Sequence, residues 1–224
     1  MSDDVTKNVQ KFFHHYAEGF DSIYGHSATR GAFGRWVDRR FRQTMYSRFR
    51  EVLGNTASPD IHSVLDVGCG SGRYIVEFLK QGKDVVGLDV AEGMLTVARN
   101  ITANMRFDGK VEFVLSGYLE HRFDRRFDAA CLMGFFDYIE KPTDIFEKLK
   151  RDVTKEIYAS FPQSGGPLAW QRRVRYKLRK CPLWLYSRSD VLTIMERSGF
   201  VNNFQILDFG RDWFVKVDLR GATT

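Results

Sequence analysis

The chain has 224 residues, of which 43% are hydrophobic and 28% charged, a composition typical of a soluble globular domain. It excludes collagen-like, low-complexity and largely disordered proteins, and no apolar run approaches the ~20 residues of a transmembrane helix. The polar, acidic start does not resemble a secretory signal. Cys69, Cys131 and Cys181 lack paired or metal-ligand spacing, so we expect reduced thiols, no metal site and a cytoplasmic protein.

The net charge of +6 is unevenly distributed. Residues 30–50 hold seven arginines and one acid, Asp38, and residues 172–188 hold seven lysines and arginines and no acid. Concentrated positive charge favours an anionic partner near these two segments, although two solvated helix faces would give the same pattern.

Residues 1–60 predict an N-terminal helical cap, because two stripes of apolar side chains recur at helical spacing. The stripes are Val9, Phe12, Phe13, Tyr16 and Phe20, then Val37, Phe41, Met45, Phe49 and Val52. Residues 55–60 read as a linker to a core domain at 61–224.

Strand and helix patterns alternate in the first hundred residues of that core. This predicts an α/β fold with a mostly parallel sheet. We expect strands at 63–67, 84–88, 111–115, 127–133 and 153–160, and helices at 72–81, 91–103 and 143–150.

Two features interrupt the alternation. Residues 161–187 read as a basic insertion after the fifth strand, with a helix that packs through Trp170, Val174 and Leu178 and ends before Pro182. After a helix at 188–198, strands at 201–207 and 212–217 have no helix between them, so they form an antiparallel pair. The sheet then has seven strands in a Rossmann-like arrangement.

The most informative segment is the stretch LDVGCGSG at 65–72, where a buried strand enters a glycine-rich turn and then a helix. Glycines allow sharp turns and a close approach of ligand to backbone N–H groups. The spacing G-x-G-x-G is not that of dinucleotide-binding loops. Asp66 precedes the glycines, where a carboxylate can fix the loop or accept from an ammonium group. Asp89 closes the next strand, where related folds bind ribose hydroxyls.

These features resemble class I S-adenosylmethionine-dependent methyltransferases, and residues 60–160 carry the likeness. The resemblance implies S-adenosylmethionine as cofactor, cradled by the glycine loop, with Asp89 on its ribose and Val90 and Met94 against its adenine. It also implies a lid helix around residues 16–24. The full implied cofactor set is Tyr16, Tyr24, Asp66, Gly68, Cys69, Gly70, Gly72, Asp89, Val90, Met94, Gly117, Tyr118, Met133 and Gly134. The general layout is loosely similar to magnesium-protoporphyrin and ubiquinone methyltransferases.

One position departs from the family pattern. The family usually carries an acid after the third strand that hydrogen-bonds the adenine amino group, and Gly117 occupies that place here. Loss of one such contact would cost about 1 kcal/mol, which weakens binding without abolishing it.

Methyl transfer from a sulfonium needs alignment and exclusion of water more than it needs a base. The catalytic candidates are Asp137 and Tyr138, which follow the fourth strand, and His14 on the lid helix; His15 and His121 are further candidate bases. Cys131 lies inside a strand and reads as core. The candidate acceptor-binding residues are Phe135, Phe136, Trp170, Arg172 and Arg175, with Arg173 and Arg179 on the same basic helix. The aromatic residues could equally belong to the core.

The favoured function is methyl transfer to oxygen on a small anionic acceptor. An RNA methyltransferase is a second interpretation, motivated by the basic segments, but nucleic acid is the less favoured partner because no RNA-binding module is evident. A non-catalytic methyltransferase-like binding protein is a third, motivated by Gly117 and by the absence of an obvious base.

Overall fold

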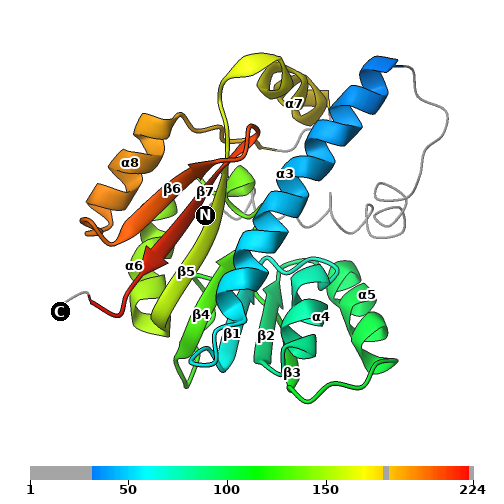
Figure 1. The fold of residues 1–224 in the computed structure, drawn as a ribbon, viewed down its shortest axis with the longest axis vertical. Coiled ribbons are helices and arrows are strands. Elements are labelled where there is room, and N and C mark those ends of the chain that lie inside the picture. The colour runs from blue at the N-terminus through cyan, green and yellow to red at the C-terminus, as the bar shows by residue number, and fades with distance from the viewer. Residues whose placement is uncertain (1–31, 179–181, 222–224) are drawn as a thin grey trace.

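A single seven-stranded sheet organises the protein (Figure 1). The computed structural model describes residues 32–178 and 182–221. The strand order is β3-β2-β1-β4-β5-β7-β6, parallel from β3 to β5 and antiparallel at β7 and β6. The strands are β1 Ser63–Val67, β2 Asp84–Asp89, β3 Val111–Leu115, β4 Phe127–Leu132, β5 Val153–Pro162, β6 Phe204–Asp208 and β7 Asp212–Asp218. The predicted Rossmann-like fold with its terminal antiparallel hairpin is confirmed.

Helices cover both faces of the sheet. On one face, α3 (Ala32–Thr56), α4 (Arg73–Lys80) and α5 (Glu92–Ala103) bury Val52, Phe78 and Leu95 against the strands. On the other, α6 (Pro142–Asp152) and α8 (Arg188–Arg197) bury a second core cluster. Both faces of the central strands are therefore dry, which explains their nearly continuous apolar sequences.

The expected element boundaries are correct to within a few residues, with two differences. The strand expected from residue 201 begins only at Phe204, because Asn202 adopts a positive φ of 61° that ends extended pairing before it. A short 3-10 helix, η2 (Phe136–Tyr138), follows β4 and was not expected. It gives the segment after β4 a fixed, buried conformation rather than an open loop.

The basic insertion contains a helix, α7 (Gly166–Leu178), beyond the carboxyl end of β5 (Figure 1). The prediction that this helix packs through Trp170 and Val174 is wrong. Trp170 is 69% exposed and Val174 is 39% exposed, whereas Ala169 and Tyr176 are buried. The helix is turned because Arg172 and Tyr176 find polar partners beneath it, and those contacts prevail over the apolar stripe.

Part of the predicted N-terminal cap is described. Helix α3 accounts for residues 32–56, and the ring of Phe49 lies 4.8 Å from that of Tyr74 on α4. The predictions for His14, His15, Tyr16, Tyr24, Arg179 and Cys181 lie outside the described residues. For Arg175 the structure describes the helix but not the side chain.

Candidate active site

The residues expected to bind the cofactor come from four parallel strands that end at the same edge of the sheet. Register pairs Asp66 with Cys131 and Asp89 with Leu115, so the segments after β1, β2, β3 and β4 leave the sheet side by side. Ligands of open α/β sheets bind at this edge. The sheet therefore brings the glycine loop, Asp89, Gly117 and Gly134 to one side of the molecule.

The glycine loop adopts a conformation that other residues would resist. Gly68, Gly70 and Gly72 have φ values of 71°, 53° and 78°. A Cβ at Gly68 would lie 2.9 Å from the ring of Phe135, and one at Gly72 would lie 3.0 Å from Cβ of Ala98. The three glycines are thus required both by the turn and by the close approach of α5 and the segment after β4.

Asp89 holds this loop in place, a role beyond the one expected for it. One carboxylate oxygen accepts the backbone N–H of Gly70 at 2.9 Å, and the other accepts that of Ala91 at 2.9 Å. Burial raises the pKa of Asp89, and these backbone donors oppose the rise. Each oxygen keeps a further lone pair, so Asp89 can brace the loop and still accept from a ligand hydroxyl.

Asp66 is a buried acid with one unpartnered oxygen. Its side chain is almost inaccessible, and Oδ2 has no hydrogen-bond partner. Burial, followed by the charge of Asp89, raises the pKa of Asp66 to about 8. An orphaned acceptor beside a glycine cradle fits a ligand that brings a positively charged donor. The unpartnered oxygen of Asp66 and the glycine loop therefore both fit the expected cofactor.

The position of Gly117 is filled by another acid. A Cβ at residue 117 would overlap the carboxylate of Glu120, which folds back over the turn. The sequence pattern does not indicate Glu120, because this acid lies three residues after the position where the family usually carries one. The turn at 118–120 brings its carboxylate back beside Gly117. Tyr118, by contrast, is buried, and its hydroxyl donates to Asp152 of α6 at 2.8 Å.

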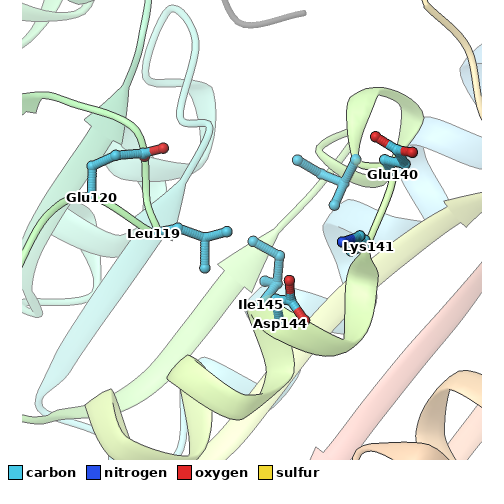
Figure 2. A pocket seen from close by; sticks show the side chains of 7 residues that line it. Leu119, Glu120, Glu140, Lys141, Asp144 and Ile145 are labelled. Carbon is cyan, nitrogen blue, oxygen red and sulfur yellow. The ribbon is translucent and has the colours of Figure 1, made fainter. Parts of the chain in front are cut away.

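A pocket of about 260 Å³ opens next to this turn, between the segments that follow β3 and β4 (Figure 2). Leu119 and Ile145 form an apolar side, and Glu120 and Glu140 stand on opposite rims. Within residues 32–178 and 182–221, none of the residues expected to bind the cofactor lines it. The lining residues are Leu119, Glu120, Ile139, Glu140, Lys141, Asp144 and Ile145.

The candidate catalytic residues after β4 are buried and already have partners. The carboxylate of Asp137 pairs with Arg172 of α7, and the hydroxyl of Tyr138 lies 3.0 Å from that of Tyr176. Burial raises the pKa of Asp137, although Arg172 opposes the shift. Phe136 is fully buried among Phe146 and Phe161, which places it in the core.

The remaining candidates are spread around this edge. Met133, Gly134 and Phe135 are half-buried, and Phe135 packs under the glycine loop. Cys131 is fully buried beside Asp66, as its interpretation as a core residue requires. His121 packs its ring on Phe123 at 4.6 Å. Val90 is half-buried and Met94 is buried, with its Cε 3.3 Å from the place of a Cβ on Gly70.

Comparison with known proteins finds similar methyltransferases. Residues 64–156 match the family model described as a methyltransferase domain. These residues include the glycine loop and Asp89, so the match supports the resemblance to class I S-adenosylmethionine-dependent methyltransferases. The magnesium protoporphyrin IX methyltransferase of Synechocystis PCC 6803 with bound SAH has a similar fold, with a TM-score of 0.71, 14% identity, and coverage of 94% of this chain and 97% of that one.

Two curated relatives have different acceptors in their names. The ubiquinone biosynthesis O-methyltransferase of Aliivibrio fischeri (strain MJ11) is 32% identical over 126 residues, 53% of each chain. The tRNA U34 carboxymethyltransferase of Haemophilus influenzae (strain PittGG) is 26% identical over 184 residues, 76% of this chain and 54% of the relative. The chain thus spans about half the length of the curated relatives it matches.

Among the helices of residues 32–178 and 182–221, none combines the length and apolar character needed to cross a bilayer. Over the same residues, no group of three or more His, Cys, Asp or Glu side chains is arranged to hold a metal ion.

Proposed function

We propose that this protein transfers the methyl group of S-adenosylmethionine to an oxygen atom of a small anionic acceptor. The observation that carries the cofactor assignment is the unpartnered, buried oxygen of Asp66 beside a loop of three glycines that Asp89 braces. When bound, the cofactor supplies an activated methyl group on a positively charged sulfur.

The chain's own residues then have distinct tasks. Asp66 offers its free oxygen to the ammonium group of the cofactor's methionine part, and Asp89 offers its remaining lone pairs to the ribose hydroxyls. Met133 and Gly134, which directly follow β4, would border the bound cofactor, and Phe135, which packs against Gly68, would contact the acceptor. Tyr138 and His14 remain candidate bases for an acceptor that must lose a proton.

Glu120 takes the place of the acid that the family carries at residue 117. Its carboxylate fills the space over Gly117 and is exposed, so it can accept from the adenine amino group. Glu120→Gln keeps an acceptor oxygen and should weaken cofactor binding less than Glu120→Ala does. Equal and unchanged binding in both variants would remove Glu120 from the site.

Support for an anionic acceptor comes from α7. This helix, which lies beyond the carboxyl end of β5, carries arginines and a lysine but no acid, and Arg173 is exposed on it. An anion held by such an arginine gains a charge-assisted hydrogen bond worth about 1.5–3 kcal/mol. Oxygen as the methylated atom is supported by the relative active in ubiquinone biosynthesis, whose name states O-methyl transfer.

A nucleic acid acceptor is the second candidate, favoured by the longer alignment with the tRNA enzyme and by the basic segments. Calorimetric titration of the full chain with S-adenosylmethionine and its demethylated product tests the cofactor, and we expect dissociation constants of tens of micromolar or tighter as an order of magnitude. A methyl-transfer screen over anionic aromatic, sugar and lipid acceptors tests the substrate. Steep salt dependence of binding to bulk tRNA would favour the second candidate.

A further inference from the structure

Four charged side chains from distant parts of the sequence meet next to the end of β4. Arg172 of α7 contacts Asp137 of η2 through Nη2 and Asp212 of β7 through Nη1, the latter at 3.2 Å. Arg48 of α3 reaches the other oxygen of Asp212, also at 3.2 Å. All four side chains are between 5 and 13% exposed. We call these residues the Arg–Asp cluster.

The cluster is electrically balanced, with two arginines and two aspartates. Burial alone would raise the pKa of Asp212, but Arg48 and Arg172 together hold it below its usual value. Removing one member leaves an uncompensated buried charge, which folded proteins tolerate poorly. The four segments are therefore held in one arrangement by mutual charge compensation.

The cluster also reaches the backbone at the end of β4. Arg48 donates through Nη1 to the hydroxyl oxygen of Ser160 at 3.1 Å. The same oxygen accepts the backbone N–H of Gly134 at 2.8 Å. A continuous path of polar contacts thus links α7 to Gly134, which has a φ of 74° and lies one residue after Met133.

This geometry argues against Arg172 as the group that binds the acceptor's anion. Its two terminal nitrogens are already engaged by carboxylates, and an anion placed beside it would also meet Asp137 and Asp212. Arg173, the next residue on α7, is exposed, and no carboxylate of the described residues pairs with it. The two neighbouring arginines therefore have different environments.

We propose that Arg172 is a positioning residue, which fixes α7 against the segment after β4 and holds Asp137 as its structural partner rather than as a base. The proposal rests on the proposed function for its effect on the acceptor. The proposed attachment of α7 by Arg172 does not depend on methyl transfer.

The matched pair Arg172→Ala and Arg173→Ala tests this. Amide hydrogen exchange in 166–178 should be about tenfold faster or more in Arg172→Ala and nearly unchanged in Arg173→Ala. With an acceptor in hand, both variants should raise its KM, whereas only Arg172→Ala should also lower kcat. Calorimetric affinity for S-adenosylmethionine should stay within about twofold of wild type in both, because neither residue touches the glycine loop and Arg172 reaches Gly134 only through Asp212, Arg48 and Ser160.

Two further variants keep the outcome decisive. Arg172→Lys retains the charge but offers one nitrogen where arginine offers two, so it should show part of the exchange effect if Arg172→Ala fails to fold. Asp137→Asn should keep the acid limb of the pH–rate profile; loss of that limb would make Asp137 the base and overturn the proposal. Unchanged exchange in α7 for both Arg172 variants would overturn it too, whereas absence of cofactor binding and methyl transfer by wild type would reject only the proposed function.

Discussion

The two halves of the sheet are assembled in different ways. In the β1–β2 half, the site consists of short segments that are close in sequence. Asp89, at the end of β2, accepts the backbone N–H groups of Gly70 and Ala91 and so holds the glycine loop against that strand. In the β4–β7 half, the site depends on side chains separated by up to 164 positions, such as Arg48 and Asp212. The first half is a local motif that a sequence displays directly. The second is a long-range arrangement that only the folded chain creates.

The largest effect is expected from the local half. Gly70 has a φ of 53°, and a side chain there would extend toward Met94, beside the place that we propose for the cofactor. We expect Gly70→Val to weaken S-adenosylmethionine binding by about 100-fold or more, through backbone strain and lost approach together. Calorimetry on a variant shown to be folded by circular dichroism checks this. Wild-type affinity in that variant would remove the glycine loop from the cofactor site.

Asp89 should come next. Asp89→Ala removes the two carboxylate oxygens that would accept from the cofactor's hydroxyls, and it leaves the backbone N–H groups of Gly70 and Ala91 without their acceptor. We therefore expect the free energy of cofactor binding to weaken by roughly 2 kcal/mol or more. Asp89→Asn, which keeps one acceptor oxygen, is the matched control and should lose less. NAD should not compete in wild type, because the loop lacks dinucleotide spacing. Competition by NAD at similar concentrations would contradict the family assignment.

Asp66 makes the local half sensitive to pH. The pKa of Asp66 is raised to about 8, above the value near 3.9 of an unfolded chain. The folded protein therefore binds more protons than the unfolded chain between these values, and its stability without ligand falls as pH rises through that window. Asp66→Asn abolishes this loss, so the melting temperature of the variant should exceed that of wild type more at pH 8 than at pH 5.

Cofactor affinity should move in the opposite direction. An ammonium donor prefers the ionised carboxylate, so wild-type affinity for S-adenosylmethionine should rise between pH 6 and 8, and the rise should be absent in Asp66→Asn. A calorimetric pH series on both proteins measures it. Parallel profiles for the two proteins would show that the free oxygen of Asp66 does not meet the ligand.

The contrast between the halves explains what the sequence could predict. Strand–helix alternation and the glycine spacing are local signals, so the predicted fold is confirmed, and residues 64–156 match a methyltransferase domain. The sequence did not predict the partners of Arg172. Periodicity shows which side chains of a helix are apolar, but it does not show which distant charged residues a helix will contact. Trp170 and Val174 made α7 look apolar on one side, whereas the buried side passes through Arg172 and Tyr176. Glu120 was missed for a related reason, since a turn moved its carboxylate to a place that linear alignment gives to Gly117.

The smallest effect on stability should come from the side of α7 that the sequence favoured. Trp170 is 69% exposed, so Trp170→Ala should change the free energy of unfolding by about 0.5 kcal/mol or less. Tyr176→Ala, on the buried side of the same helix, removes a packed ring and the contact with Tyr138, and should cost about 3 kcal/mol. Chemical denaturation of the two variants measures both. Because Trp170→Ala should change stability so little, a raised acceptor KM in this variant would indicate direct contact between Trp170 and the acceptor rather than altered packing. An unchanged KM would place Trp170 outside the acceptor site.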